Sequence, residues 1–291
     1  MNITLAKHHG MCFGVRDALR LTHDLATGEN VTVLGQLVHN PVVDAHLKTL
    51  GVQRGDLADL GSASTKTVVI TAHGAADSSR NAWRAAGHKV ADTTCPLVRK
   101  AHRSLECLVL GGYFPVVIGE KNHVEVRGLI ADFPDALVIS EADEIANVPF
   151  YEKIGVVSQT TQPLRHVQQL LAEIERQRPD SEVKFVDTVC QPTKDRQNAL
   201  EELCDANDTI VVVGGRNSNN TKQLVIRAIG LGCAAYQVEG AADLEEKWFR
   251  RSKNIGVTAG TSTLDETVRD VFERLKQIGA KRRGGLLAKV A

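Results

Sequence analysis

The sequence passes twice through the same order, in Val90-Ala91-Asp92-Thr93-Thr94-Cys95 and in Val186-Asp187-Thr188-Val189-Cys190. Each copy is a β-rich stretch that ends in Asp-Thr-x-Cys and is followed by an amphipathic stretch, to about Leu108 and about Leu203 respectively. A third cysteine, Cys12, also lies between a strand-like and a helix-like stretch. Such alternation is typical of parallel βαβ units, so we predict an α/β fold built on an internal repeat.

Each of these cysteines is followed by two further strand-like stretches that end in polar residues. The polar ends are 35–40 and 71–74 after Cys12, 119–123 and 158–161 after Cys95, and 214–218 and 258–262 after Cys190. Ligands collect at the carboxyl ends of parallel strands, so we expect three small α/β domains in a pseudo-threefold arrangement around one shared site. The predicted domains are 1–95 with Cys12, 96–188 with Cys95 at its start and Glu125, and 189–291 with Cys190 and a Ser/Asn loop.

The composition excludes several classes of protein. Lys plus Arg and Asp plus Glu both number 35, so the formal net charge is zero and no nucleic-acid partner is predicted. No apolar run approaches the roughly 18 residues that span a bilayer, and the start of the chain lacks an apolar signal core, so we predict no membrane partner and a cytoplasmic location. Six cysteines without a secretory signal favour metal or thiol chemistry over disulfides.

Cys12, Cys95 and Cys190 are the candidate metal ligands. Each is predicted to precede a helix, and the partial positive charge of a helix N-terminus favours a thiolate. Three thiolates could hold zinc with a histidine as fourth ligand, or a 4Fe-4S cluster with one open iron. Zinc sites usually show paired C-x2-C spacing, which is absent here, so the iron-sulfur cluster is favoured. The other three cysteines, Cys107, Cys204 and Cys233, are interpreted as structural.

Three histidines stand at predicted strand ends, namely His39, His73 and His123. In the third repeat the corresponding position is a loop rich in hydroxyls and amides, 217–221, which opens a predicted helix. This loop is either a well-capped helix start or, together with Ser262 and the histidines, a site for a phosphate or diphosphate.

Glu125 is the acidic residue closest to these motifs. In a partly dry pocket its pKa would rise, so that it could carry a proton, and Thr160 could relay that proton. The alternative is a solvated loop glutamate. Asp92 and Asp187, three residues before their cysteines, are predicted to be capping or turn residues and not catalytic acids.

These motifs together resemble the LytB family of 4-hydroxy-3-methylbut-2-enyl diphosphate reductases. The resemblance is colinear from Ile3 to about Leu275 and rests on G-M-C-F-G-V (10–15), V-H-N-P (38–41), A-H-G (72–74), D-T-T-C-P-L-V (92–98), G-E-K-N-H-V-E-V (119–126), S-Q-T-T-Q (158–162), N-S-N-N (217–220) and T-A-G-T-S (258–262). It implies an oxidoreductase that carries out the last step of the methylerythritol phosphate pathway of isoprenoid biosynthesis.

The resemblance also implies a set of site residues. The metal ligands are Cys12, Cys95 and Cys190, which hold a 4Fe-4S cluster with one open iron. The substrate diphosphate is held by His39, His73, His123, Ser218, Asn219, Asn220 and Ser262. Many members carry Ser at Asn219 and Pro at Val124, and we expect altered affinity and retained function. Glu125, Thr160 and His123 act at the substrate, Glu125 and Thr160 serving its hydroxyl group. Electrons come from a ferredoxin or a flavodoxin.

Two other functions would fit an open iron. One is an aconitase-like dehydratase acting on a phosphorylated substrate, which would cause no net reduction. The other is a non-catalytic iron-sulfur sensor, which would tolerate the change Glu125→Gln.

Overall fold

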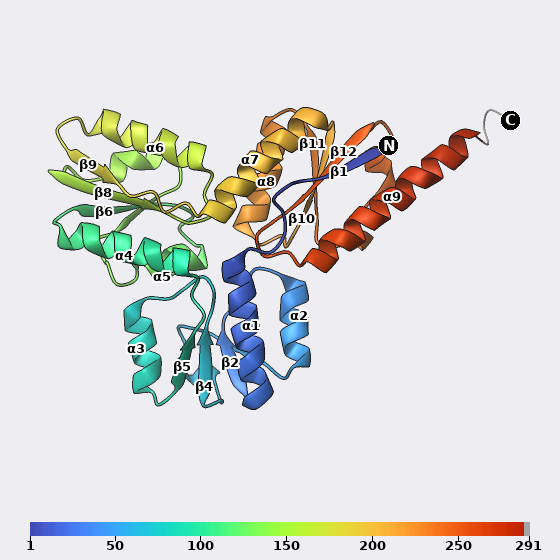
Figure 1. The fold of residues 1–291 in the computed structure, drawn as a ribbon. Helices are drawn as coiled ribbons and strands as arrows, with labels where there is room; N and C mark the ends of the chain where they lie inside the picture. The colour runs from blue at the N-terminus through green and yellow to red at the C-terminus, as the bar shows by residue number, and fades with distance from the viewer. Residues whose placement is uncertain (288–291) are drawn as a thin grey trace. The chain divides into compact units, whose positions relative to one another are not determined.

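The computed structural model describes residues 1–287, with side chains described to residue 281. Over these residues, twelve strands alternate with nine α-helices, and the strands form three four-stranded parallel sheets (Figure 1). The predicted α/β fold is therefore confirmed.

The three sheets are built from successive parts of the chain. The first has the order β3-β2-β4-β5 (Gln53–Gly55, Val31–Leu34, Thr67–Ile70, Lys89–Asp92). The second has the order β7-β6-β8-β9 (Leu137–Ile139, Phe114–Ile118, Lys153–Ser158, Glu182–Phe185). The third has the order β11-β10-β12-β1 (Ala234–Val238, Thr209–Val213, Asn254–Ala259, Asn2–Leu5).

The helices follow the same threefold division. The first group is α1 (Phe13–Gly28), α2 (Pro41–Thr49) and α3 (Asp77–Ala85), the second is α4 (Pro96–Leu110), α5 (Val124–Ile130) and α6 (Leu164–Gln177), and the third is α7 (Gln191–Ala206), α8 (Asn219–Gly230) and α9 (Asp265–Leu287). Short 3-10 helices η1 to η4 cover Leu60–Ser62, Ala142–Asn147, Ala241–Asp243 and Glu246–Phe249. Helices α4 and α7 end at Leu110 and Ala206, slightly later than the predicted ends near Leu108 and Leu203.

Strand order is the same in all three sheets. The strand that precedes a cysteine, β5, β9 or β1, always lies at an edge of its sheet. In the third sheet this edge strand is the first strand of the chain, where Ile3 pairs with Ile255 of β12. The domain ranges 1–95, 96–188 and 189–291 stay a prediction. The strand pairing shows that Asn2–Leu5, within the first predicted range, joins the last sheet.

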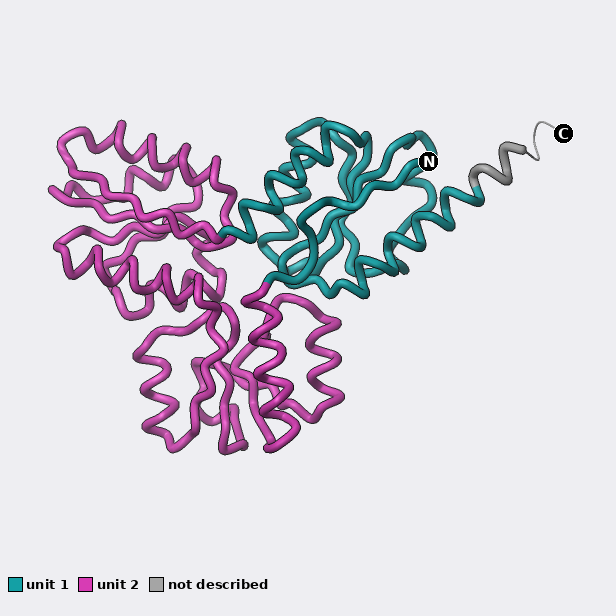
Figure 2. Tube along the Cα trace, viewed as in Figure 1, with its two compact units in different colours: residues 1–12, 191–291 teal, residues 13–190 magenta. Residues whose placement is uncertain are grey.

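The chain divides into two compact units (Figure 2). One unit is Phe13–Cys190, which contains the first and second sheets. The other combines Met1–Cys12 with Gln191–Ala291 and contains the third sheet. Each unit is described by itself.

The second sheet shows why these strands form a buried layer. Val116 and Ile118 of β6 pack in the cluster that contains Leu170 of α6, whereas Val117 packs in the cluster that contains Leu105 of α4. Successive side chains of a strand point to opposite faces, so an uninterrupted apolar strand needs helices on both sides. Burial of each such side chain stabilises the fold by about 1.5–3 kcal/mol.

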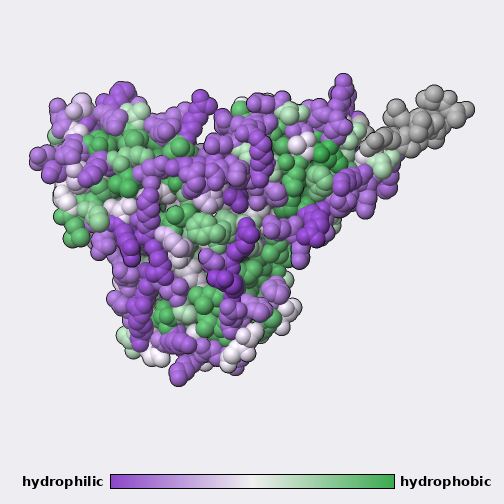
Figure 3. All heavy atoms as spheres, viewed as in Figure 1, coloured by the Kyte–Doolittle hydropathy of each residue, from purple (hydrophilic) through white to green (hydrophobic). Residues whose placement is uncertain are grey.

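Outside these cores, polar and hydrophobic residues share the drawn surface (Figure 3). Among the helices of the described residues, we find none with a stretch apolar and long enough to span a bilayer.

Candidate active site

The three repeat cysteines have the same backbone anchor. Each donates its N–H to the carbonyl of a loop that follows a central strand: Cys12 to Thr261 (2.9 Å), Cys95 to Ala72 (3.0 Å) and Cys190 to Thr160 (2.9 Å). Each directly precedes a helix, α1, α4 or α7, and each is partly exposed. A helix N-terminus carries partial positive charge, and cysteines bind metals as thiolates.

The Asp-Thr-x-Cys motif is a turn that holds the cysteine. Asp92 Oδ1 accepts a hydrogen bond from the N–H of Thr94 (2.9 Å), and Asp187 Oδ1 accepts one from the N–H of Val189 (3.1 Å). The two middle threonines match as well, because Thr93 donates to the carbonyl of Ile70 and Thr188 to that of Ser158, at 2.5 and 2.6 Å. Both copies of the motif are therefore local structural devices with the same hydrogen bonds.

The remaining cysteines differ from these three. Cys204 and Cys233 are buried in the core of the third sheet, where burial and the neighbouring Cys233 raise the pKa of Cys204 to about 12. Cys107 is exposed on α4. Within the described residues, no three His, Cys, Asp or Glu side chains are grouped so that they could hold a metal ion. Cys12 belongs to one compact unit, and Cys95 and Cys190 belong to the other. A ligand set made of all three cysteines is therefore a proposal.

Gly14 shows how closely the start of α1 approaches the thiol of Cys95. A Cβ atom at Gly14 would lie 2.4 Å from Cys95 Sγ, closer than real Cβ contacts allow. Any side chain at this position, two residues after Cys12, would displace the thiol. Glycine therefore leaves room beside Cys95 for whatever that sulfur binds.

The histidine cluster, which consists of His39, His73 and His123, lies within the unit Phe13–Cys190. The ring centroids of His39 and His73 are 4.4 Å apart, and that of His123 is 5.3 Å and 5.7 Å from them. Burial lowers the pKa of His73 well below its usual value, and the two neighbouring imidazoles lower it further. Its Nδ1 atom is buried and has no hydrogen-bond partner in the described part of the chain. A ligand that carries negative charge would satisfy this atom and offset the repulsion between protonated rings.

Two supporting residues of this cluster were missed in the sequence. Gln36 donates from Nε2 to Asp44 Oδ2 (2.8 Å), which turns its Oε1 atom toward His39 Nδ1 at 3.2 Å. Because Oε1 can only accept, Nδ1 of His39 carries the proton in this arrangement. The sequence offered no signal for this contact beyond the proximity of Gln36 to His39.

Glu125 is fully buried and bound to Thr160. It is 2% exposed, and its carboxylate accepts hydrogen bonds from the N–H (2.6 Å) and the hydroxyl (2.9 Å) of Thr160. Burial raises the pKa of Glu125 to about 7, although the two hydrogen bonds from Thr160 oppose the rise. The N–H of Glu125 donates to Nδ1 of His123 (3.2 Å), and the carbonyl of Thr160 accepts from Cys190. A titratable acid is thus joined on one side to the histidine cluster and on the other to a repeat cysteine.

The amide–hydroxyl loop, which consists of Ser218, Asn219, Asn220 and Ser262, lies in the other unit. All four residues are buried. Ser218 caps α8 by accepting from the N–H of Thr221, and Asn220 Oδ1 accepts from the N–H of Thr261 at 3.0 Å.

The same loop contains buried polar atoms with no partner. Asn220 Nδ2 and Thr221 Oγ1 form no hydrogen bond with any described residue. A Cβ atom at Gly260 would lie 2.2 Å from Thr221 Oγ1, so the backbone passes very close to this hydroxyl. Unsatisfied donors at the N-terminus of a helix are suited to binding an anion. Thr221 and Gly260 were not singled out from the sequence as site residues.

Comparisons with known proteins agree with this chemistry. A family model described as LytB protein matches residues 3–276. A 4-hydroxy-3-methylbut-2-enyl diphosphate reductase of Aquifex aeolicus (strain VF5) is 35% identical over 286 residues, which cover 96% of this chain and 97% of that protein. The reductase of the same name from Geobacter sulfurreducens is 34% identical, with 98% of this chain and 100% of that protein covered.

Solved structures give the same result. The E-1-hydroxy-2-methyl-but-2-enyl-4-diphosphate reductase from Plasmodium falciparum matches with a TM-score of 0.87 and 25% identity, over 92% of this chain and 86% of that one. A structure described as (E)-4-hydroxy-3-methyl-but-2-enyl diphosphate reductase, the terminal enzyme of the non-mevalonate pathway, matches with a TM-score of 0.68 and 34% identity, over 95% and 100% of the two chains. The match to the family model and the full-length relatives show that the chain belongs to the LytB protein family.

Proposed function

We propose that this protein reduces 4-hydroxy-3-methylbut-2-enyl diphosphate to isopentenyl diphosphate and dimethylallyl diphosphate, the last step of the methylerythritol phosphate pathway. The observation that carries the proposal is the buried pair of Glu125 and Thr160, bonded to both the histidine cluster and Cys190. In the reaction the allylic C–O bond breaks, two electrons and two protons are consumed, and the oxygen leaves as water.

Cys12, Cys95 and Cys190 would hold a 4Fe-4S cluster with one open iron. Their thiols fit such a group because each directly precedes a helix, each is partly exposed, and Gly14 leaves room beside Cys95 Sγ. When bound, the cluster supplies electrons one at a time and a Lewis acid for the alcohol oxygen.

Glu125 is the proton donor in this proposal. With a pKa of about 7 it holds a proton in a large fraction of molecules near neutral pH. Thr160 Oγ1, 2.9 Å from Glu125 Oε2, can pass that proton to a substrate hydroxyl and take up the one from Glu125. The bond from Glu125 N–H to His123 holds the acid in place beside the anion site.

The diphosphate would be bound by both clusters. The histidine cluster offers imidazole N–H groups, and the amide–hydroxyl loop offers the N-terminus of α8 with the unpartnered Asn220 Nδ2. Charged and neutral donors together suit a ligand with several phosphate oxygens.

The electrons would come from a ferredoxin or a flavodoxin, and neither a nucleic acid nor a membrane takes part. The protein would act in the cytoplasm, where a labile cluster and free thiols stay reduced.

The test is an anaerobic assay with reconstituted protein, reduced methyl viologen and the hydroxylated diphosphate. We expect consumption of substrate and formation of the two C5 diphosphates. A product that has lost water without gaining electrons would instead identify a dehydratase, and no turnover at all, with the cluster shown to be intact by Mössbauer spectroscopy, would overturn the proposal.

Cysteine variants test the ligand set separately. Cys12→Ser, Cys95→Ser and Cys190→Ser should each lose the cluster absorbance, and the exposed Cys107→Ser should keep it. A cluster retained in any of the first three variants would remove that residue from the ligand set.

A further inference from the structure

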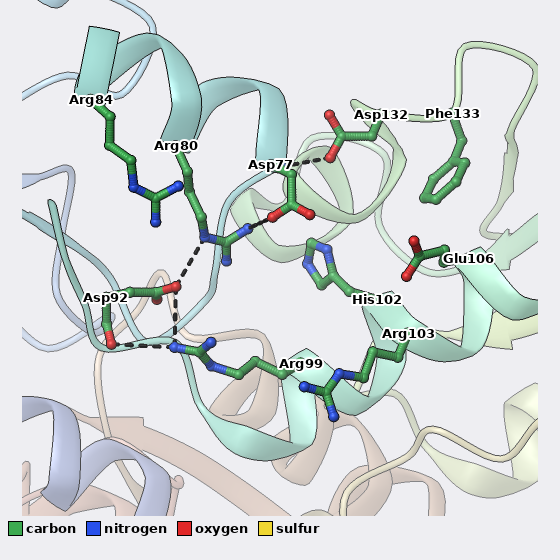
Figure 4. Close-up of a pocket in the computed structure, with 10 residues that line it drawn as sticks. All are labelled: Asp77, Arg80, Arg84, Asp92, Arg99, His102, Arg103, Glu106, Asp132 and Phe133. Atoms are coloured by element: carbon green, nitrogen blue, oxygen red, sulfur yellow. Dashed lines mark hydrogen bonds and ion pairs between the residues drawn. The ribbon is translucent and has the colours of Figure 1, made fainter. Parts of the chain in front are cut away.

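Behind the loop of Cys95 lies a polar pocket whose inner wall is a buried arginine (Figure 4). The cavity measures about 440 Å³ and lies between α3, the end of β5 and α4. Arg80 of α3 is only 8% exposed although it carries a full charge. A buried guanidinium needs several hydrogen bonds to offset the cost of desolvation, so its partners are informative.

The first set of partners belongs to the turn before Cys95. Arg80 Nε donates to Asp92 Oδ2 (3.0 Å), and Nη2 donates to Thr94 Oγ1 (3.2 Å). Asp92 is the aspartate of the Asp-Thr-x-Cys motif, and Arg99 forms a second ion pair with it at 3.1 Å. The guanidinium is therefore bonded to the side chains of the turn that holds the cysteine.

The second set of partners lies in the loop after His73 and at the start of α3 itself. Arg80 Nη1 donates to the backbone carbonyl of Ala75 and to Asp77 Oδ1, the latter at 2.9 Å. Ala75 lies two residues after His73 and is completely buried. One planar, rigid fork thus binds the loop of His73 and the loop of Cys95 at the same time.

We propose that Arg80 is a positioning residue that fixes the imidazole of His73 relative to the thiol of Cys95. This inference rests on the proposed function, because it links a diphosphate ligand to a cluster ligand. Lysine cannot replace it, since one ammonium group cannot reach four acceptors in the geometry of the fork.

Arg80→Lys tests the proposal, with Arg84→Gln as matched control. Arg84 lines the same pocket from the same helix, and its Nη1 donates locally to Asn81 Oδ1. With holoenzyme and reduced methyl viologen, we expect Arg80→Lys to raise KM for the diphosphate about tenfold and to shift the cluster's midpoint potential, whereas Arg84→Gln should change neither.

A merely structural role would lower the melting temperature and leave KM and the potential unchanged, and this result would overturn the proposal. Because Arg80→Lys could fail to fold, Thr94→Val is a second variant, which keeps Arg80 and removes the bond from its Nη2 together with the bond from Thr94 Oγ1 to Asp92. It should fold and shift the potential in the same direction by less. An unchanged potential in Thr94→Val together with an unchanged KM in Arg80→Lys would show that Arg80 does not position the site. Wild-type protein that binds the cluster but has no activity would count against the proposed function. The midpoint potentials of the variants would still test whether Arg80 positions the site.

A second inference rests on a neighbouring groove along α4, of about 480 Å³, which shares Arg99 and Arg103 with the first pocket and is lined by cations. Arg99, Lys100, Arg103 and Lys184 line it, and no acidic residue does. Lys100, Arg103 and Lys184 form no ion pair with any described residue. Apolar and aromatic side chains, among them Leu108 and Tyr113, also line the groove.

The groove also borders a candidate cluster ligand. Pro96, which lines it, directly follows Cys95 in the sequence. The rate of electron transfer falls steeply with distance, so a donor seated here would deliver electrons near the thiol. A lining that combines unpaired cations with apolar side chains suits a partner with acidic residues around a small apolar contact.

We infer that this groove docks a one-electron carrier protein with an acidic surface around its redox centre. The inference rests on the proposed function, which requires an external donor of single electrons. The double variant Lys100→Glu/Lys184→Glu should weaken binding of an acidic 2Fe-2S ferredoxin about tenfold and make the affinity less dependent on salt. Lys66→Glu, an exposed change on the same unit, is the control.

Two measurements separate the possible failures. Titration of holoenzyme with the ferredoxin gives Kd directly, and turnover with methyl viologen should be the same in wild type and both variants. Equal Kd values in the double variant and in Lys66→Glu would overturn the docking site. A lack of viologen turnover in wild type would overturn the proposed function, while the Kd values would still decide the docking site.

Discussion

The histidine cluster and the amide–hydroxyl loop lie at equivalent places in the repeat but carry different chemistry. Both follow central strands of parallel sheets and both open helices, α5 at His123 and α8 at Ser218. The first consists of three imidazoles, whose ring centroids lie within 5.7 Å of each other, and an imidazole can gain a proton. The second consists of neutral amides and hydroxyls that hold no charge at any ordinary pH. If both bind the diphosphate as proposed, the repeated backbone sets where the anion binds, and the side chains decide whether binding is coupled to protons.

The largest expected effect comes from changing the acid Glu125, and it should be larger than that of removing a donor from either cluster. Glu125→Gln keeps the shape and the bond to Thr160 but cannot supply a proton, so turnover with methyl viologen should fall about 1,000-fold. Binding of the diphosphate, measured by calorimetry, should change little. Thr160→Val should lower turnover less, because Glu125 remains. A large loss of affinity in Glu125→Gln would mean that the carboxyl group serves the anion site and not the proton.

Single substitutions in the two clusters should differ in size. His73→Gln removes a donor that becomes charged when an anion binds, and we expect KM for the diphosphate to rise about 30-fold. Asn220→Ala removes a neutral donor and should raise KM about fivefold. Steady-state kinetics on both variants checks the order. Equal effects would show that the histidines bind as neutral donors.

The pH dependence of binding should come from one cluster only. In the free protein, burial and the neighbouring rings hold the pKa of His73 well below its usual value, so this ring is neutral. A bound diphosphate favours the protonated ring, which means that protons are taken up on binding and affinity falls as pH rises. The slope of log Kd against pH should remain in Asn220→Ala and become smaller in His73→Gln. An unchanged slope in His73→Gln would assign the proton uptake to the ligand.

Much of this comparison could be predicted from sequence, because the residues that carry it lie close together in the chain. The motif at Asp92 and the one at Asp187 are continuous stretches whose hydrogen bonds span two residues. The pairing of Ile3 with Ile255 could not be anticipated, since nothing near either residue specifies a partner at the other end of the chain. The bond from Gln36 to Asp44 and the buried hydroxyl of Thr221 were missed for a similar reason. Polar residues of these types are common in surface loops, and only the folded chain shows that they are buried or aimed at a site.

The smallest expected effect lies in the stability of the protein, where two buried groups of the same unit act in opposite directions. Glu125 has a pKa of about 7 in the folded chain, so between its ordinary value of 4.5 and about 7 the folded state binds more protons than the unfolded state. Stability is therefore lost as pH rises through this window, by at most about 3 kcal/mol. His73 is neutral when folded and protonated when unfolded below its ordinary pKa of 6.5, so its contribution to stability increases as pH rises.

Urea unfolding at pH 5 and pH 8 should show that Glu125→Gln stabilises the protein at pH 8 relative to wild type and has little effect at pH 5. The same experiment on His73→Gln should show stabilisation at pH 5 and little effect at pH 8. If Glu125→Gln had the same effect at both pH values, the carboxyl group would have an ordinary pKa in the folded chain, and the proposed proton donor would then be ionised near neutral pH.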